Sequence, residues 1–255
     1  METIFWILAG LVFYVYAGYP MFLWLIRVVG LAKPNLVGNL EPTVSILISA
    51  YNEVGVITEK ISNTLSLDYS IEKLEIIVIS DCSNDGTDEA VQAFNRPNVK
   101  LLRMPDRGGK TLGLNAAVQV SLGEILVFSD ANAMYEQQAL RNITRNFFDP
   151  KVGAVIGEST YADSDGNAQE SESLYWKYET NIKVLETSIG SVVGGDGAIY
   201  AIRKTLYKPM PADALSDFVN PIQIVMSGYR CIYEPTAKSI EEATDNMEKE
   251  FRRKV

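Results

Sequence analysis

The sequence predicts an α/β fold, in which a mostly parallel sheet carries helices on both faces and follows one hydrophobic helix. Three observations support this prediction. The chain has 255 residues, of which 47% are hydrophobic, enough for one sizeable core. An uncharged apolar stretch opens the chain, and four apolar runs then alternate with segments of helical periodicity. Strands and helices that alternate in this way form parallel sheets through right-handed crossovers.

The first expected element is a transmembrane helix within residues 1–30. Residues 3–26 contain no charge, and roughly 24 helical residues extend about 36 Å, enough to cross the apolar core of a bilayer. Arg27 and Lys33 follow this stretch, whereas only Glu2 precedes it. The positive-inside rule therefore predicts a cell-membrane protein with a single-pass N-terminal anchor and a cytoplasmic domain. A signal peptide and a hydrophobic helix lying against the domain are the alternatives.

A linker and a regular series of strands and helices are expected next. Residues 31–42 contain two prolines and Gly38, which is typical of a linker. The domain after it is expected over residues 43–255. Its strand and helix pairs are 44–49 with 54–65, 75–80 with 87–94, 99–103 with 111–121, and 125–129 with 136–147. After a fifth strand at 152–156 the regularity fades, and we expect helices at 173–185 and 218–226 and strands at 198–202 and 231–233.

The composition excludes several kinds of site. The chain has no histidine, so histidine-based zinc sites and Ser-His-Asp triads are excluded and any acid-base step must use a carboxylate. The two cysteines, Cys82 and Cys231, lack metal-ligand spacing. A metal would therefore be a hard cation with oxygen ligands, such as Mg²⁺ or Mn²⁺. The net charge of -9 argues against nucleic acid as a partner.

Polar side chains come directly after the predicted strands. Asp130 and Asn132 follow strand 125–129, and Asp81 follows strand 75–80. Ligands bind beyond the carboxyl ends of strands in open α/β sheets, so these side chains are expected to face one crevice. An acid and an amide at that place could hold an oxygen-ligated cation that bridges to a phosphate. The polar run after strand 75–80 would also suit a turn and a helix cap without any ligand.

Two further segments carry side chains that could bind a ligand. Tyr51 follows the first strand and could stack on a nucleobase, although Asn52 beside it would also suit a helix N-cap. Lys110 opens a predicted helix, where a cation beside the helix N-terminus suits an anionic group. This segment does not match a P-loop, because Met104 stands where the P-loop pattern needs a glycine.

Four motifs in this order resemble the inverting family 2 glycosyltransferases. They are Ser-Ala-Tyr-Asn-Glu at 49–53, Ser-Asp-Cys-Ser-Asn-Asp-Gly-Thr at 80–87, Arg-Gly-Gly-Lys at 107–110 and Phe-Ser-Asp-Ala-Asn at 128–132. The resemblance covers about residues 43–253 and is strongest to membrane-bound polysaccharide synthases, relatives of cellulose, chitin and hyaluronan synthases. It implies a GT-A fold with a nucleotide-sugar-binding half at 43–150 and an acceptor-side half at 151–255. It also implies a nucleotide-diphosphate sugar as donor and Mg²⁺ or Mn²⁺ as cofactor.

The resemblance further implies which residues form the site. Those that would bind the nucleotide sugar are Ala50, Tyr51, Glu53, Asp81, Lys110, Asp130 and Arg253. Asp130 and Asn132 match the D-x-D metal motif of the family, with an amide where a second acid is common. An amide oxygen can ligate a cation but brings less charge.

The second half of the chain carries the remaining motifs. Residues 215–218 are similar to the T-E-D motif, so Asp217 would be the catalytic base, although a helix N-cap is an equally good interpretation of this residue. Gly195 and Asp196 resemble an acceptor-binding loop or form a tight turn. Residues 250–254 lie where synthases carry Q-x-x-R-W, and Arg253 matches its arginine, although a basic juxtamembrane patch is the alternative. The membrane helices that follow in many relatives are missing, which indicates a truncated or a minimal form.

Together these features predict a membrane-anchored glycosyltransferase. It would move a sugar from a nucleotide-diphosphate sugar, of the UDP type, to a saccharide or lipid-linked acceptor, with inversion at the anomeric carbon. A polyprenyl-phosphate sugar transferase is an alternative within the same fold. A non-catalytic sugar-nucleotide-binding protein is another, which the departures from the family motifs at Asn132 and Ser216 would suit. A nucleotidyltransferase is a third, but the basic N-terminal loop that it needs is absent.

Overall fold

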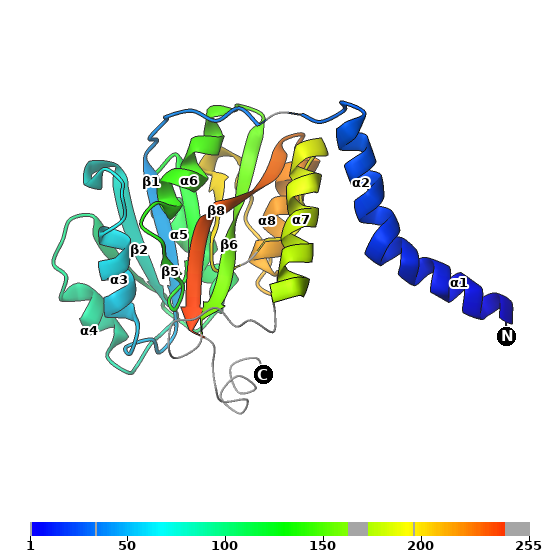
Figure 1. Ribbon diagram of the computed structural model, residues 1–255. Coiled ribbons are helices and arrows are strands. Elements are labelled where there is room, and N and C mark those ends of the chain that lie inside the picture. The colour runs from blue at the N-terminus through cyan, green and yellow to red at the C-terminus, as the bar shows by residue number, and fades with distance from the viewer. Residues whose placement is uncertain (1, 34, 163–172, 196, 243–255) are drawn as a thin grey trace.

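The computed structural model describes residues 2–33, 35–162, 173–195 and 197–242. In these ranges the chain forms one eight-stranded sheet, with helices packed on it and a long N-terminal helix that projects away from it (Figure 1). The strand order is β3-β2-β1-β4-β7-β6-β8-β5. The α/β class predicted from the sequence is confirmed.

The first half of the sheet is parallel. Its strands are β1 (Val44–Ala50), β2 (Leu74–Ser80), β3 (Val99–Arg103) and β4 (Ile125–Asp130). The helices that follow them are α3 (Ile57–Leu65), α4 (Thr87–Gln92), α5 (Lys110–Val120) and α6 (Ala139–Thr144). β1 lies between β2 and β4, and β3 pairs with β2. β1, β2 and β4 are nearly continuous apolar runs because helices cover both faces of the sheet, whereas β3 is only partly buried.

The second half of the sheet is mixed. Its strands are β5 (Met134–Tyr135), β6 (Val152–Ala162), β7 (Tyr200–Arg203) and β8 (Arg230–Glu242). β7 runs antiparallel to β4 and β6, β8 runs parallel to β6, and β5 runs antiparallel to β8. β8 is much longer than the strand expected at 231–233. Its extension reaches the edge of the sheet where β4 ends, and this position matters for the site.

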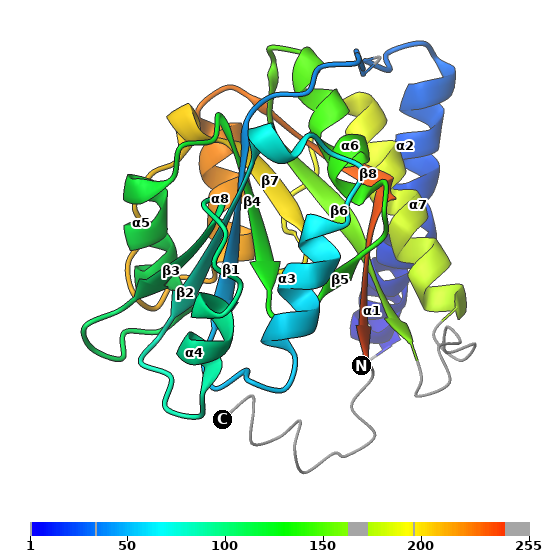
Figure 2. The same cartoon turned by 90° about the vertical axis from the view of Figure 1, so that its left-hand side faces the viewer.

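Helices cover both faces of the sheet (Figure 2). Side chains alternate across a strand, so Ile48 of β1 points to one face and Leu47 to the other. Ile48 packs in a core with Ile61 of α3 and Leu140 of α6. Leu47 packs in a second core with Leu114 of α5 and with residues of α8 (Ser216–Met226). Helix α7 (Ser173–Ile189) lies beside β8.

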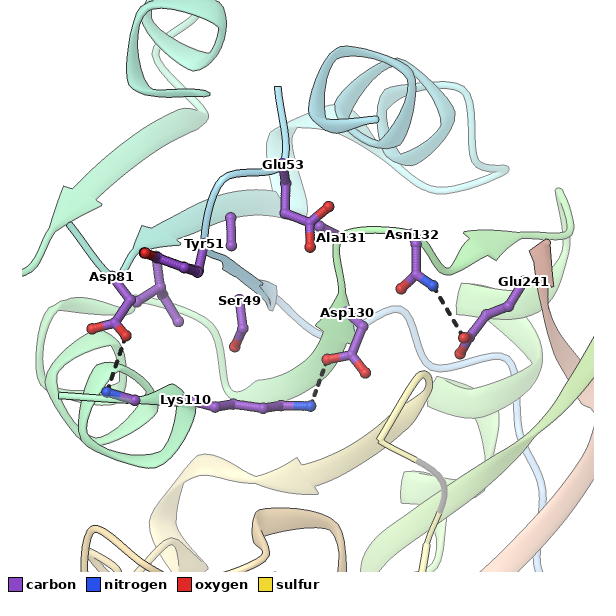
Figure 3. A pocket seen from close by; sticks show the side chains of 12 residues that line it. Ser49, Tyr51, Glu53, Asp81, Lys110, Asp130, Ala131, Asn132 and Glu241 are labelled. Carbon is purple, nitrogen blue, oxygen red and sulfur yellow. Dashed lines mark hydrogen bonds and ion pairs between the residues drawn. The ribbon is translucent and has the colours of Figure 1, made fainter. Parts of the chain in front are cut away.

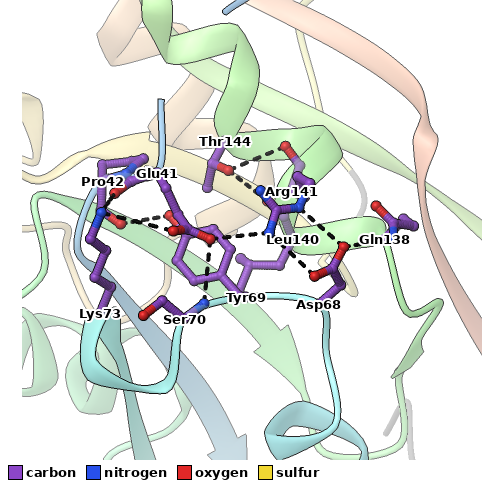
Figure 4. Close-up of polar contacts among 10 residues, drawn as sticks. All are labelled: Glu41, Pro42, Asp68, Tyr69, Ser70, Lys73, Gln138, Leu140, Arg141 and Thr144. Carbon is purple, nitrogen blue, oxygen red and sulfur yellow. Dashed lines mark hydrogen bonds and ion pairs between the residues drawn. The ribbon is translucent and has the colours of Figure 1, made fainter. Parts of the chain in front are cut away.

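Polar contacts hold the end of the expected linker on the domain (Figure 4). The Tyr69 hydroxyl donates to the carbonyl of Pro42 at 2.6 Å, and the Lys73 ammonium donates to the carbonyl of Glu41 at 2.7 Å. Arg141 pairs with the Glu41 carboxylate at 3.2 Å. The chain is therefore fixed to the domain just before β1 begins, while the division into linker and domain halves stays a prediction.

The N-terminal segment is helical from Glu2 to Val28. It consists of α1 (Glu2–Phe13), a π-helical turn (Tyr14–Gly18) and α2 (Tyr19–Val28). By length and composition the helix could cross a membrane, and none of its most apolar window is buried. α2 lies beside α7 in both views (Figures 1 and 2). The Tyr19 hydroxyl donates to Glu186 of α7 at 2.5 Å, and the Tyr178 hydroxyl of α7 donates to the carbonyl of Tyr16 at 3.0 Å.

Candidate functional site

A pocket of about 380 Å³ lies at the carboxyl ends of the parallel strands (Figure 3). This volume is typical of a small-molecule site. The residues predicted from the sequence that line the pocket are Ala50, Tyr51, Glu53, Asp81, Lys110, Asp130 and Asn132. The pocket also contains Glu241 of β8, which the sequence had not indicated. The structure thus brings together side chains from four separate strand ends and one helix N-terminus.

The register of the sheet explains why these residues meet. Ala50 pairs with Ser80 and Ser49 with Asp130, so β1, β2 and β4 end at the same level. The chain turns sharply just beyond two of these ends, where Asn52 and Cys82 have positive φ angles of 56° and 60°. The Asn52 side chain accepts a hydrogen bond from the N–H of Asn84 at 2.9 Å, and α3 begins only at Ile57. The alternative interpretation of Asn52 as a helix N-cap is therefore wrong.

Asp81 holds the loop that leads into α5. Its two carboxylate oxygens accept hydrogen bonds from the N–H groups of Gly108, at 2.8 Å, and Gly109, at 3.0 Å. Charge-assisted bonds of this kind are stronger than neutral ones. They fix the start of α5, from which the Lys110 side chain extends into the pocket (Figure 3). The contact of Asp81 with a nucleoside stays a prediction.

Tyr51, which lines the pocket, is stacked against Arg107. The guanidinium carbon of Arg107 lies 3.9 Å from the ring centroid of Tyr51, a cation–π contact. Tyr51 is 38% exposed at the mouth of the pocket. A nucleobase that stacks on the same face of this ring would have to displace Arg107.

Lys110, Asp130 and Asp217 converge on Gly197. The Lys110 ammonium is 2.5 Å from Asp130 Oδ1. A β-carbon at position 197 would lie 3.2 Å from Lys110 Nζ, 3.4 Å from Asp217 Oδ2 and 3.5 Å from Asp130 Oδ2. The motif at the end of β4 and the motif at the start of α8 therefore face each other across one small space, which the missing side chain of Gly197 leaves open.

Asp217 lies in the first turn of α8 rather than at its N-cap. The helix begins at Ser216, and the N-cap residue is Leu215, which makes no side-chain capping bond. The interpretation of Asp217 as an N-cap is therefore wrong. Its carbonyl accepts a hydrogen bond from the N–H of Gly195 at 2.9 Å, so the expected acceptor loop packs directly against the candidate base. Two other predicted residues, Asp196 and Arg253, lie outside the described residues.

A buried lysine supports the turn after β4. Lys60 of α3 is fully buried, and its ammonium donates to the carbonyl of Ala133 and lies 3.7 Å above the ring of Tyr135. Burial lowers the pKa of Lys60 to about 7, although the negative charges of Asp130 and Glu241 act in the opposite direction. No sequence motif had indicated this residue. Its spacing from the buried Ile57, Ile61 and Thr64 was the available signal.

Glu241 completes the inner side of the pocket. It is 6% exposed, and its Oε2 accepts a hydrogen bond from the Asn132 side-chain amide at 3.2 Å (Figure 3). The extension of β8 beyond the predicted strand places it there.

The oxygen atoms in the pocket suit a hard cation that takes its remaining ligands from the substrate. Asp130, Asn132 and Glu241 offer oxygens to the pocket, and the Lys110 ammonium beside Asp130 shows that this carboxylate attracts positive charge. Among the described residues, no three acidic, cysteine or histidine side chains are grouped closely enough to hold a metal by themselves. Mg²⁺ is commonly held by one or two carboxylates together with substrate phosphates, and the residues fit that arrangement.

Comparisons with known sequences agree with the motifs. A sequence model of the family described as glycosyl transferase family 2 matches residues 45–207. Poly-beta-1,6-N-acetyl-D-glucosamine synthase of Staphylococcus aureus is 28% identical over 243 residues, which cover 92% of this chain and 57% of the relative. The probable glycosyltransferase YdaM of Bacillus subtilis is 33% identical over 123 residues, or 46% of this chain and 29% of the relative. The chain thus spans a little over half the length of the synthase.

Solved structures share the fold. The mannosyltransferase PcManGT from Pyrobaculum calidifontis, in complex with GDP-Man and Mn²⁺, has a TM-score of 0.77 and 27% identity, covering 94% of this chain and 69% of that one. GalNAc-T7 with UDP, GalNAc and Mn²⁺ has a TM-score of 0.60 and covers 81% of this chain and 45% of that one, but at 15% identity it shows the fold alone. The expected GT-A fold is confirmed. Since the family model covers most of the domain in addition, the chain belongs to glycosyl transferase family 2.

Proposed function

We propose that this chain is a membrane-anchored, inverting glycosyltransferase that uses a nucleotide-diphosphate sugar, a divalent cation and Asp217 as base. The observation that carries the proposal is the convergence of Lys110, Asp130 and Asp217 within 3.5 Å of the position of a β-carbon on Gly197. Displacement at an anomeric carbon needs a base for the attacking hydroxyl and positive charge for the departing diphosphate. This space offers a carboxylate for the first task and an ammonium for the second.

Each of these side chains has a distinct task in the reaction. Asp217 Oδ2 accepts the proton of the acceptor hydroxyl while the hydroxyl oxygen attacks the anomeric carbon, whose bond to the diphosphate breaks. The Lys110 ammonium lies at the same space and offsets the negative charge that develops on the diphosphate oxygen. Asp130 and Asn132 would hold the cation, which when bound offsets further charge on the leaving group.

The remaining pocket residues would bind the substrates. Tyr51, Glu53 and Asp81 line the pocket together with Ala50 and would hold the nucleoside. Gly195 lies next to the carbonyl of Asp217, which suits a contact with the acceptor beside the base. The family resemblance assigns Asp196 to the acceptor and Arg253 to the donor.

The relatives indicate which substrates to test. The Staphylococcus aureus protein is named for a polymer of N-acetylglucosamine, and the Pyrobaculum calidifontis structure contains GDP-Man. We propose a UDP-sugar as donor, a saccharide as acceptor and polysaccharide synthesis as the role. The helix Glu2–Val28 would be the single anchor in the cell membrane. Arg27 in its last turn and Lys33 beyond it would keep the domain cytoplasmic.

Release of nucleoside diphosphate from a panel of donors tests the proposal. The full-length protein in detergent with Mn²⁺ would be given UDP-sugars and GDP-mannose, each with oligosaccharide or polyprenyl-phosphate acceptors. Asp130→Ala and Asp217→Asn should each lower the rate by about 100-fold or more without a large change in melting temperature. Asp213→Asn is the matched control, because Asp213 is an exposed acid four residues before Asp217.

The outcomes separate the competing functions. Unchanged rates in Asp130→Ala and Asp217→Asn would contradict the assigned roles. Consumption of the polyprenyl phosphate but of no saccharide would identify a polyprenyl-phosphate sugar transferase. Binding of UDP without turnover of any donor would identify a non-catalytic sugar-nucleotide-binding protein.

A further inference from the structure

The proposed cation site lacks an acid at position 132. The segment at the end of β4 contains Asp130, Ala131 and Asn132, so the motif itself brings one carboxylate. An amide oxygen ligates Mg²⁺ or Mn²⁺ without neutralising its charge. A second acid would have to come from another part of the chain.

Strand pairing brings an acid to this position. β5 pairs with β8 so that Met134 faces Ile240 and Tyr135 faces Ser239. In an antiparallel pair the next residues outward along the two strands are neighbours, which places Glu241 beside the turn that contains Asn132. Glu241 is 6% exposed and lines the same pocket as Asp130. Its place is therefore set by backbone register and not by the choice of a surface rotamer.

The contact between the two side chains also fixes the orientation of the amide. The Asn132 Nδ2 donates to Glu241 Oε2 at 3.2 Å, so the amide oxygen points to the other side, toward Asp130 (Figure 3). An aspartate at position 132 would instead bring two carboxylates together at this distance, which like-charge repulsion disfavours. An amide at 132 and an acid at 241 are thus a matched pair.

The turn is held from behind as well. The buried Lys60 ammonium donates to the carbonyl of Ala133, the residue directly after Asn132. The ring of Tyr135, two residues further along the chain, lies under the same ammonium. Asn132 is therefore fixed by Lys60 through the backbone on one side and by Glu241 through the amide on the other.

We propose that Glu241 is the second acid of the cation site, in place of the acid that position 132 lacks, and that it turns the Asn132 amide oxygen toward the cation. This inference rests on the proposed function, because it takes the ligand of the pocket to be a divalent cation with a nucleotide diphosphate. It adds a residue from β8 to a site that the sequence motif confines to the end of β4.

Binding of Mn²⁺ alone to the full-length protein in detergent, followed by the electron paramagnetic resonance signal of free Mn²⁺, tests the proposal. Glu241→Gln keeps an oxygen that accepts the bond from Asn132 but removes the charge. We expect it to weaken Mn²⁺ binding by about 10- to 100-fold and to raise the Mn²⁺ concentration for half-maximal transfer. The control is Glu136→Gln. Glu136 is 45% exposed and pairs with Lys238 of β8, the strand that contains Glu241.

Exchanging the acid and the amide between positions 132 and 241 tests whether these two positions share one carboxylate. The double variant Asn132→Asp with Glu241→Gln returns the acid to position 132 and places the amide at 241, so Mn²⁺ affinity should recover to within about threefold of wild type. Glu241→Asp keeps the charge and provides the comparison if Glu241→Gln melts well below wild type. It should bind Mn²⁺ more tightly than Glu241→Ala.

Each outcome bears directly on the proposed role of Glu241. If wild type binds Mn²⁺ and transfers sugar while Glu241→Gln matches it in both, Glu241 is not the second acid and the proposed function stands. Failure of the double variant to recover affinity overturns the proposal too, because an acid at 132 would then not replace Glu241. If wild type neither binds Mn²⁺ nor turns over any donor, the proposed function fails and takes this inference with it.

Discussion

Replacement of Lys60 by methionine should change how the stability of the fold depends on pH. Lys60 is fully buried below the turn that follows β4, and burial lowers its pKa from 10.5 to about 7. Methionine has a similar length and no charge. The variant therefore removes the titrating group, while it leaves the carbonyl of Ala133 without its side-chain donor.

The sign and size of the effect follow from this lowered pKa. Between about pH 7 and pH 10 the unfolded chain binds a proton at Lys60 that the folded chain has released, so the free energy of unfolding rises with pH in this window. The rise contributed by Lys60 is about 2 kcal/mol between pH 7 and pH 9. The lost hydrogen bond to Ala133 costs about 1–3 kcal/mol, but this cost does not vary with pH.

Urea unfolding of the full-length protein in detergent, followed by circular dichroism at several pH values from 7 to 9, measures the difference. The curve for Lys60→Met should be flatter than the wild-type curve by about 2 kcal/mol over this range. Lys177→Met is the control, because Lys177 is an exposed lysine on α7 and its removal should leave the slope unchanged. Parallel curves for wild type and Lys60→Met would refute the reasoning, since Lys60 would then titrate alike in the folded and unfolded chain.

Three other substitutions have defined outcomes. Gly197→Ala puts a methyl group 3.4 Å from Asp217 Oδ2, so kcat for nucleotide release should fall about tenfold or more at nearly unchanged melting temperature. Asp81→Asn removes one of two acceptor oxygens for backbone N–H groups and should lower the free energy of unfolding in urea by about 1 kcal/mol. Burial raises the pKa of Glu158, which accepts from Tyr233, so wild type loses stability as pH rises. Glu158→Gln should therefore gain in melting temperature relative to wild type as pH rises above the ordinary range of a carboxyl group, and a constant difference would contradict this.

The parallel half of the fold was predictable because its signals are local. Each buried strand is a short apolar run, and a polar residue ends it, as Asp81 and Asp130 do. The strand expected at 99–103 matches β3 (Val99–Arg103). The sheet topology then brings these strand ends to one edge, so most of the pocket could be assigned before any geometry was known.

Helix α3 begins later than the sequence predicts because long-range contacts decide where it starts. The helix was expected from residue 54 but begins at Ile57. The preceding backbone is held instead by the polar segment that joins β2 to α4, where Thr87 accepts from the N–H of Glu53 at 2.9 Å and Asp85 accepts from the N–H of Val54 at 3.1 Å. Local periodicity contains no information about partners more than thirty residues away.

The length of β8 was missed for a related reason. Pro235 indicates the end of a strand, yet β8 continues to residue 242 because β6 and β5 pair with it on either side. Ala237, Ser239 and Glu241 are buried in alternation with more exposed neighbours. The alternation was present in the sequence, but small and polar residues carry it, and a search for hydrophobic periodicity does not detect it.

The charges around the pocket imply that cation and donor bind cooperatively. The Lys110 ammonium is 2.5 Å from Asp130 Oδ1, so a cation that approaches Asp130 alone competes with an ammonium that is already there. A diphosphate offers that ammonium another partner and frees the carboxylate. UDP should therefore tighten Mn²⁺ binding, and by thermodynamic linkage Mn²⁺ should tighten UDP binding by the same factor. In Lys110→Met the competing charge is gone, so Mn²⁺ alone should bind more tightly and the factor should shrink. Equal factors in variant and wild type would show that the pair with Asp130 does not couple the two ligands.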